Sequence, residues 1–251
     1  KNSIQFKWLK AEEIKMLRKA DKVITRSHAA IDFHINIIGE VYRDKFSIVY
    51  NGRNSNFFKP DIKLRESSRS ELKIKKDEKV FLYCGSLGGA KYSIAEMILI
   101  FQEYLKINKK AKFLILTGNL DIANRSVPNE LMNKVIIKCV PFQDVSKYLN
   151  VGDVALALIE PKMSMKAVAA IKLGEYLLMG IPTIASAGIG DSEAIIKKTP
   201  DCFLYRHSDE NRIQETASFL QKPFEGSPAK IRKIGLKYFS LEKSAESYIN
   251  A

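Results

Sequence analysis

The stretch KVFLYCGSLGGAKYS, residues 79–93, joins an apolar segment to a glycine-rich turn and then to a predicted helix. Residues 79–84 are rich in β-forming side chains, which favours a buried strand. The glycines within 85–89 let backbone N–H groups approach an anion, and the N-terminal end of the next helix adds positive potential. The junction therefore predicts a phosphate-binding turn, with Lys91 placed to neutralise a diphosphate. The spacing matches neither the dinucleotide-binding nor the P-loop motif, so a simple tight turn is the alternative.

Strands and helices alternate along the rest of the chain, and the strands are apolar through almost their whole length. This pattern is typical of a parallel sheet covered by helices on both faces, so we expect a doubly wound, Rossmann-like α/β domain. Right-handed crossovers then bring the turns after the strands to one edge, where ligands bind. The further strands expected are 112–119, 134–140, 153–159, 182–186 and 202–206, and the helices are 93–105, 144–150, 167–179, 192–198, 212–221 and 230–250.

A smaller, partial α/β unit is predicted at the start of the chain. Its pattern is helix, strand, helix, strand, at residues 1–20, 21–27, 28–41 and 45–52. The polar residues that follow contain Pro60 and several serines, which indicates a connection between two units. We expect the first unit to be residues 1–60, the linker 61–78, the second unit 79–225 and a final helix within 226–251.

The composition is that of an ordinary globular protein with a basic surface. Hydrophobic residues make up 46% of the chain and charged residues 27%, and no apolar run reaches the roughly 18 residues needed to span a bilayer. No signal-peptide h-region precedes the first helix, which favours a cytoplasmic protein. The net charge of +13 predicts attraction to phosphate-bearing ligands or peripheral association with an anionic membrane. No nucleic-acid-binding signature accompanies it, and a merely solvated basic surface is the alternative.

Cysteines and histidines give no sign of a disulfide framework or a metal site. The cysteines lie far apart in the sequence, beside apolar runs, and are expected to be reduced core thiols: Cys84, Cys139 and Cys202. The histidines lack metal-ligand spacing and are expected to be ordinary surface or turn residues: His28, His34 and His207. No serine occupies the centre of a G-x-S-x-G turn, which argues against a hydrolase of that type. We expect neither a metal ion nor a cofactor.

A second informative stretch is SMKAVAAIKLGEYLLMGIPTIAS, residues 164–186. Lys172 and Glu175 lie three residues apart, on one face of a predicted helix near its start. Gly180 ends that helix and Pro182 opens a buried strand, so the segment is a tight helix-to-strand unit. A carboxylate at Glu175 would suit a ribose, because it accepts hydrogen bonds from two neighbouring hydroxyls. A surface ion pair between the two side chains is the alternative.

Four segments, in order, resemble the retaining glycosyltransferases of family 4, which have the GT-B fold. ADKVITRS (20–27) with KFSIVYNGRNSNFFKP (45–60) resembles the end of the family's N-terminal domain. FLYCGSLGGAKYSIAEM (81–97) resembles the glycine-rich loop that begins the C-terminal domain. VPFQDVSKYLNVGDVALALIE (140–160) resembles the segment that meets the nucleobase, and IKLGEYLLMGIPTIAS (171–186) resembles the family's K-x-x-E motif. The resemblance covers nearly the whole chain.

The resemblance implies two Rossmann-like domains across a cleft, with the acceptor held by the first and a nucleoside diphosphate sugar by the second. Residues 1–60 would be only the end of the first domain, so the chain would be part of a longer enzyme, and the last helix would brace that first domain. The reaction implied is sugar transfer to an acceptor hydroxyl with retention. The expected acceptor is a glycan or a lipid-linked molecule, in the synthesis of cell-surface polysaccharide.

The resemblance also assigns roles to individual residues. Lys172 and Lys91 would face the diphosphate, and Glu175 would hold the ribose. Pro141, Phe142 and Val145 would border the base. The other donor-binding residues implied are Gly85, Ser86, Leu87, Gly88, Gly89, Asn119, Ser164 and Lys166.

The chain departs from the family pattern in two places. Ala167 stands where the first glutamate of the E-x7-E motif is expected, and Tyr92 follows Lys91 where a glycine is usual. Two alternatives therefore stay open. One is a nucleotide-sugar epimerase of the same fold, and the other is a non-catalytic nucleotide-binding or interaction module, which Ala167 favours.

Overall fold

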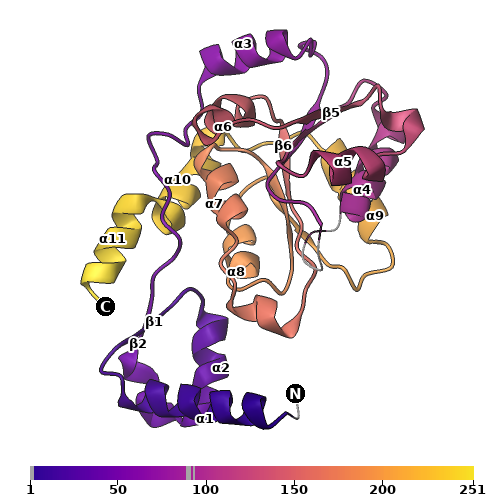
Figure 1. Cartoon of the computed structure of the whole chain (residues 1–251). Helices are drawn as coiled ribbons and strands as arrows, with labels where there is room; N and C mark the ends of the chain where they lie inside the picture. The colour runs from indigo at the N-terminus through magenta and orange to yellow at the C-terminus, as the bar shows by residue number, and fades with distance from the viewer. Residues whose placement is uncertain (1–2, 89–91, 93) are drawn as a thin grey trace.

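A computed structural model of the chain, which describes residues 3–88, 92 and 94–251, contains a small and a large α/β unit (Figure 1). The small unit has the predicted order of elements: α1 (Ile4–Lys19), β1 (Val23–Thr25), α2 (His28–Ile38), the 3-10 helix η1 (Glu40–Lys45) and β2 (Phe46–Ile48). β1 and β2 pair in parallel. Leu17 of α1 and three isoleucines of α2 form the hydrophobic core of the small unit.

The large unit is built on a six-stranded sheet with the order β5-β4-β3-β6-β7-β8. Its strands are β3 (Val80–Cys84), β4 (Lys112–Leu116), β5 (Val135–Lys138), β6 (Val154–Ala157), β7 (Thr183–Ser186) and β8 (Phe203–Tyr205). Each lies where the sequence predicts a strand, and every pairing between neighbours is parallel. The doubly wound, Rossmann-like class is therefore confirmed.

Helices cover both faces of this sheet because successive side chains of a strand point to opposite sides. Val80 and Leu82 of β3 belong to the core beneath α7 and α10, whereas Phe81 and Tyr83 belong to the core beneath α4. The helical elements between the strands are α4 (Ile94–Ile107), α5 (Leu120–Ser126), η2 (Asn129–Leu131), α6 (Phe142–Leu149), η3 (Met163–Ala167), α7 (Ile171–Leu178) and α8 (Ser192–Ile196), and α9 (Arg212–Gln221) follows the last strand.

The range 61–78, predicted as a linker, contains helix α3 (Ile62–Glu71). Asp61 caps its first turn, because its carboxylate accepts hydrogen bonds from the N–H groups of the second and third helical residues at 2.9 and 3.0 Å. Arg69 is buried beneath it and bonds the Asp153 carboxylate at 3.3 Å. The connection is thus docked on the large unit, next to α6 (Figure 1).

The end of the chain forms two helices, α10 (Pro228–Phe239) and α11 (Leu241–Ile249), so the prediction of one helix over 230–250 is wrong. Ser240 is extended, and its hydroxyl caps α11. The backbone of Arg53 reaches both sides of this break, because its N–H donates to the carbonyl of Phe239 at 2.8 Å and its carbonyl accepts from Leu241 at 2.9 Å. The break between α10 and α11 is therefore held by hydrogen bonds to a residue far away in the sequence.

Candidate functional site

The order of the strands marks where a ligand site is expected. The chain reverses its direction of winding between β3 and β6, and the turns after these two strands diverge. β6 pairs with β3 only at Phe81 and Leu82, so the end of β3 is open on that side. The hydroxyl of Tyr176, from α7, fills the gap and accepts a hydrogen bond from the N–H of Cys84 at 2.8 Å. The first turn of α7 thereby lies against the turn that starts at Gly85.

Lys172, the second residue of α7, projects into this junction. Its ammonium donates to the hydroxyl of Tyr83 at 2.7 Å and lies 3.5 Å from the ring centroid of Tyr92. A Cβ on Gly85 would come within 2.2 Å of the Lys172 Cε, and the φ of Gly85 is +145°. Glycine is therefore required here both for its backbone conformation and for the room it leaves to the lysine.

The environment of Lys172 is poor in negative charge. Burial lowers the pKa of Lys172 to about 7, and the charges of Cys84 and Glu175 oppose that shift. Burial also raises the pKa of Cys84 to about 12, so that thiol is neutral at pH 7. Because an anion placed at this ammonium would favour its charged form, the site is suited to a phosphate group.

Glu175, one turn further along α7, is ion-paired with Arg53. Its Oε1 lies 2.6 Å from Arg53 Nη2, and its side chain is 10% exposed. Burial raises the pKa of Glu175, whereas the guanidinium of Arg53 opposes the shift. The alternative of a surface pair between Lys172 and Glu175 is wrong, because the two side chains turn to different partners in a largely buried site.

Arg53 is a site residue that sequence reasoning missed. Its guanidinium lies 5.1 Å from the ring centroid of Phe58 and 5.8 Å from that of Phe142. Phe142 in turn stacks on Phe57 at 5.1 Å. These contacts bring one residue predicted to border the base, Phe142, into the same cluster as Glu175. The sequence did carry a signal, because an arginine follows the Asn-Gly turn where the family pattern has Val or Ala.

The glycine-rich turn is held from within the protein. The hydroxyl of Tyr83 donates to the carbonyl of Ser86 at 2.5 Å, and the N–H of Leu87 donates to Asn119 Oδ1 at 2.9 Å. The Leu87 side chain is buried in the core, and Gly88 has a φ of +89°. Asn119 and Leu87 therefore shape the turn. Gly89, Lys91 and the predicted helix start at Ser93 lie outside the described residues.

The remaining predicted donor residues lie on two elements. Pro141 immediately precedes α6, Phe142 is its first residue with a ring that is 56% exposed, and Val145 packs against the core. Ser164 and Lys166 lie on η3 with exposed side chains. The carbonyl of Lys166 accepts a hydrogen bond from the hydroxyl of Ser27 at 3.1 Å, so η3 contacts the small unit.

The predictions for two histidines and one cysteine are confirmed only in part. His207 lies in a turn, as one of the two predicted settings has it, but its side chain is only 10% exposed and its Nε2 lies 2.8 Å from the hydroxyl of Ser186. Cys139 is exposed, so it is not a core thiol. His28 is exposed and pairs with Asp191 at 2.8 Å.

Within the described ranges, no three His, Cys, Asp or Glu side chains gather closely enough to hold a metal ion. None of the helices in those ranges is long and apolar enough to cross a membrane.

Solved structures with a similar arrangement are GT-B glycosyltransferases. HepE of Anabaena in complex with UDP and glucose matches with a TM-score of 0.68 and 14% identity over 94% of this chain and 63% of that one. A glycosyltransferase of Rickettsia africae matches at 0.65 and 19% identity, over 92% and 62% of the two chains. WaaG, a glycosyltransferase involved in lipopolysaccharide biosynthesis, matches at 0.64 and 15% identity, over 91% and 61%.

No family model matches the chain, and no curated protein does. The structural similarities confirm the GT-B fold, with a Rossmann-like C-terminal domain. The chain spans less than two thirds of the length of the three solved proteins described.

Proposed function

We propose that the chain carries the donor-binding part of a glycosyltransferase, which transfers a sugar from a nucleoside diphosphate sugar to an acceptor hydroxyl with retention. The observation that supports this best is Lys172, a half-buried lysine whose ammonium is held beside Gly85 at the switch point of a Rossmann-like sheet. The GT-B fold adds support, because HepE has been solved with UDP-glucose and with UDP.

The proposed chemistry follows from the charges at the junction. In sugar transfer the anomeric carbon gains oxocarbenium character while negative charge collects on the leaving diphosphate. In this proposal Lys172 stabilises that charge in a partly water-excluded site, where its field is stronger than in bulk water. The amides of Gly85 and Leu87 already donate within the protein. Within the described part of the turn, the amide assigned to the diphosphate is that of Ser86, whereas Gly88 forms an isolated antiparallel bridge with Tyr92.

Glu175 is proposed to hold the ribose through Oε2, the oxygen that does not face Arg53. Burial raises the pKa of Glu175, and Arg53 opposes that rise and fixes the direction of the carboxylate. Phe142 presents an exposed ring beside Arg53, which supports a role next to the base together with Pro141 and Val145. Gly89, Lys91, Ser164 and Lys166 stay predictions as donor-binding residues.

Synthesis of a cell-surface glycan is proposed as the setting, with a glycan or lipid-linked acceptor and a cytoplasmic location. The support is the resemblance of the sequence, the basic charge and the fold shared with WaaG. No cofactor and no metal ion is assigned a role in this proposal.

Calorimetry with UDP, GDP, ADP and CMP, with and without EDTA, tests the donor site. We expect one nucleoside diphosphate to bind with micromolar affinity whether or not EDTA is present. Lys172→Met should weaken that diphosphate by about 10- to 100-fold and its nucleoside little, because a charge-assisted hydrogen bond contributes about 1.5–3 kcal/mol. Glu175→Ala should weaken the diphosphate and the nucleoside alike, since both carry the ribose.

Lys63→Met removes an equal charge from an exposed position on α3 and serves as the matched control. Absence of binding by every nucleotide contradicts the donor site and favours a non-catalytic interaction module. Equal losses for nucleoside and diphosphate in Lys172→Met contradict the assignment of the lysine to the phosphates.

A further inference from the structure

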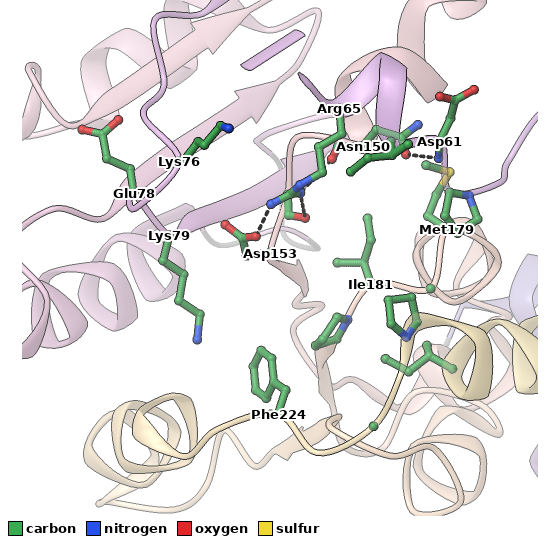
Figure 2. A pocket seen from close by; sticks show the side chains of 18 of the residues that line it. Asp61, Arg65, Lys76, Glu78, Lys79, Asn150, Asp153, Met179, Ile181 and Phe224 are labelled. Carbon is green, nitrogen blue, oxygen red and sulfur yellow. Dashed lines mark hydrogen bonds and ion pairs between the residues drawn. The ribbon is translucent and has the colours of Figure 1, made fainter. Parts of the chain in front are cut away.

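A cavity of about 660 Å³ lies at the opposite edge of the large sheet, where the strands begin. Its walls come from the segments just before β3, β6 and β7, from the start of α3 and from the segment between α9 and α10 (Figure 2). The volume lies within the roughly 300–1,000 Å³ of small-molecule sites. Because the Lys172 junction is at the carboxyl ends of the strands, this cavity is a separate place on the fold.

Two of the acidic side chains that line the cavity are matched with cations. Asp153 pairs with Arg65 at 2.5 Å and with Arg69 at 3.3 Å. It also accepts a hydrogen bond from the N–H of Val80 at 2.7 Å. Asp77 pairs with Lys110 at 2.6 Å. Asp61 caps α3, and Glu78 accepts a hydrogen bond from the N–H of Lys75 at 2.8 Å, so each of the four lining carboxylates already has a partner within the protein.

Lys79 is different, because within the described ranges no carboxylate forms an ion pair with it. Its ammonium donates to the carbonyl of Leu220 at 3.2 Å and lies 4.3 Å from the ring centroid of Phe224. Figure 2 shows its side chain extending toward the Phe224 side of the cavity, away from the Glu78 carboxylate. Burial lowers the pKa of Lys79, and the charge of Asp153 offsets that shift only in part. An anion in the cavity would supply the missing partner.

Much of the remaining wall is apolar. Ile181 and the ring of Phe224 line it from two sides (Figure 2). Pro60, Pro182 and Pro228 also line it, and their rings offer flat hydrocarbon surfaces that suit a planar ligand. Pro228 opens α10, whose N-terminus has no side-chain cap, so the helix adds weak positive potential on that side.

We propose that this cavity binds a small aromatic acid, namely a ring that carries one carboxylate or phosphate group. The acid group lies against Lys79 Nζ, and the ring packs between Phe224 and the side chains of Ile181 and Pro182. A wall with apolar surfaces and a few placed polar groups, of which Lys79 is the one assigned to the ligand, is the usual composition of a small-molecule site. The proposal is independent of the donor site, since it uses other residues at the other edge of the sheet.

Fluorescence titration with 1-naphthyl phosphate tests it, with 1-naphthalenemethanol and inorganic phosphate as the comparison ligands. We expect 1-naphthyl phosphate to bind at least tenfold more tightly than either. Lys79→Met should weaken 1-naphthyl phosphate at least fivefold and leave 1-naphthalenemethanol unchanged, because only the acid group contacts the lysine. Phe224→Leu should weaken both aromatic ligands.

Lys63→Met, an exposed lysine on α3 that does not line the cavity, is the matched control for net charge. Equal losses in Lys79→Met and Lys63→Met would overturn the proposal, as would binding of 1-naphthyl phosphate no tighter than inorganic phosphate. Competition by UDP would also overturn it, because the ligand would then occupy the donor site. Thermal unfolding of each variant establishes that it is folded. If Lys79→Met does not fold, Phe224→Leu and the ligand comparison still decide the outcome.

Discussion

Arg53 Nη2 lies 2.6 Å from Glu175 Oε1, which joins the segment after the small unit to helix α7 of the large one. The two residues are 122 positions apart, and the backbone of Arg53 is also bonded on both sides of the break between α10 and α11. A single arginine therefore connects the candidate ribose residue to the C-terminal helices. Any movement of that connection would change the surroundings of the Glu175 carboxylate.

The first prediction concerns the strength of this pair. Arg53→Met should destabilise the protein by about 3 kcal/mol, because it leaves a buried carboxylate without its partner. The loss should be clearly smaller in the Glu175→Gln background, where no charge remains to be compensated. Urea denaturation of the wild type, both single variants and the double variant gives the coupling energy, expected to be about 1–3 kcal/mol. Additive losses would mean that the pair does not stabilise the fold.

The second prediction is a pH dependence of donor binding. With a pKa of about 7, Lys172 is mostly neutral above that pH in the free protein, and an anionic ligand must bring a proton with it. Affinity should therefore fall about tenfold or more from pH 6.5 to 8.5, as expected for one linked proton. UDP-glucose is the suitable ligand, since its diphosphate has no terminal phosphate that titrates in this range.

The groups that face Lys172 do not mask this effect. Burial raises the pKa values of Cys84 and Tyr83, which keeps both neutral in this range, and Arg53 favours the ionised form of Glu175. Calorimetry in buffers of different ionisation enthalpy should show uptake of nearly one proton at pH 8.5. Lys172→Met should bind weakly and without this pH dependence. A pH-dependent affinity that survives in the variant would assign the proton to another group.

The sequence was sufficient for the large sheet and insufficient for contacts between distant segments. β3 is found at 80–84 as predicted, because a fully apolar run bounded by glycine and a polar turn leaves few other structures. The helix predicted from Ala167 begins instead at Ile171, since η3 occupies Met163–Ala167 and contacts the small unit. That contact comes from residues more than a hundred positions away and has no local signal.

The candidate site also contains features that the sequence could predict and features that it could not. The relation of Lys172 to the glycine turn could be expected from topology, because the first turn of α7 and the end of β3 meet at the switch point. The pairing of Glu175 could not, since periodicity places it on the same helical face as Lys172 and says nothing of Arg53. Helix α3 could have been predicted from the sequence, because Asp61 before a helical pattern is an N-cap signal.

The third prediction is that Gly85→Ala acts on the donor site through Lys172. The new Cβ would lie 2.2 Å from Lys172 Cε, and a φ of +145° is strained for any residue other than glycine. The lysine must therefore move, and the strain should lower the free energy of unfolding by about 1–3 kcal/mol. Diphosphate binding should weaken as strongly as in Lys172→Met. The measurements are calorimetry with the diphosphate that binds and denaturation of the same samples.

Gly118→Ala is the matched control, because a Cβ on that glycine of the turn after β4 meets nothing within 4 Å. It should leave both stability and binding close to the wild type. In the Lys172→Met background, Gly85→Ala should weaken diphosphate binding little further, since the displaced ammonium is already gone. A full additional loss there would mean that the glycine turn contacts the diphosphate independently of the lysine, and that its backbone rather than Lys172 dominates recognition of the phosphates.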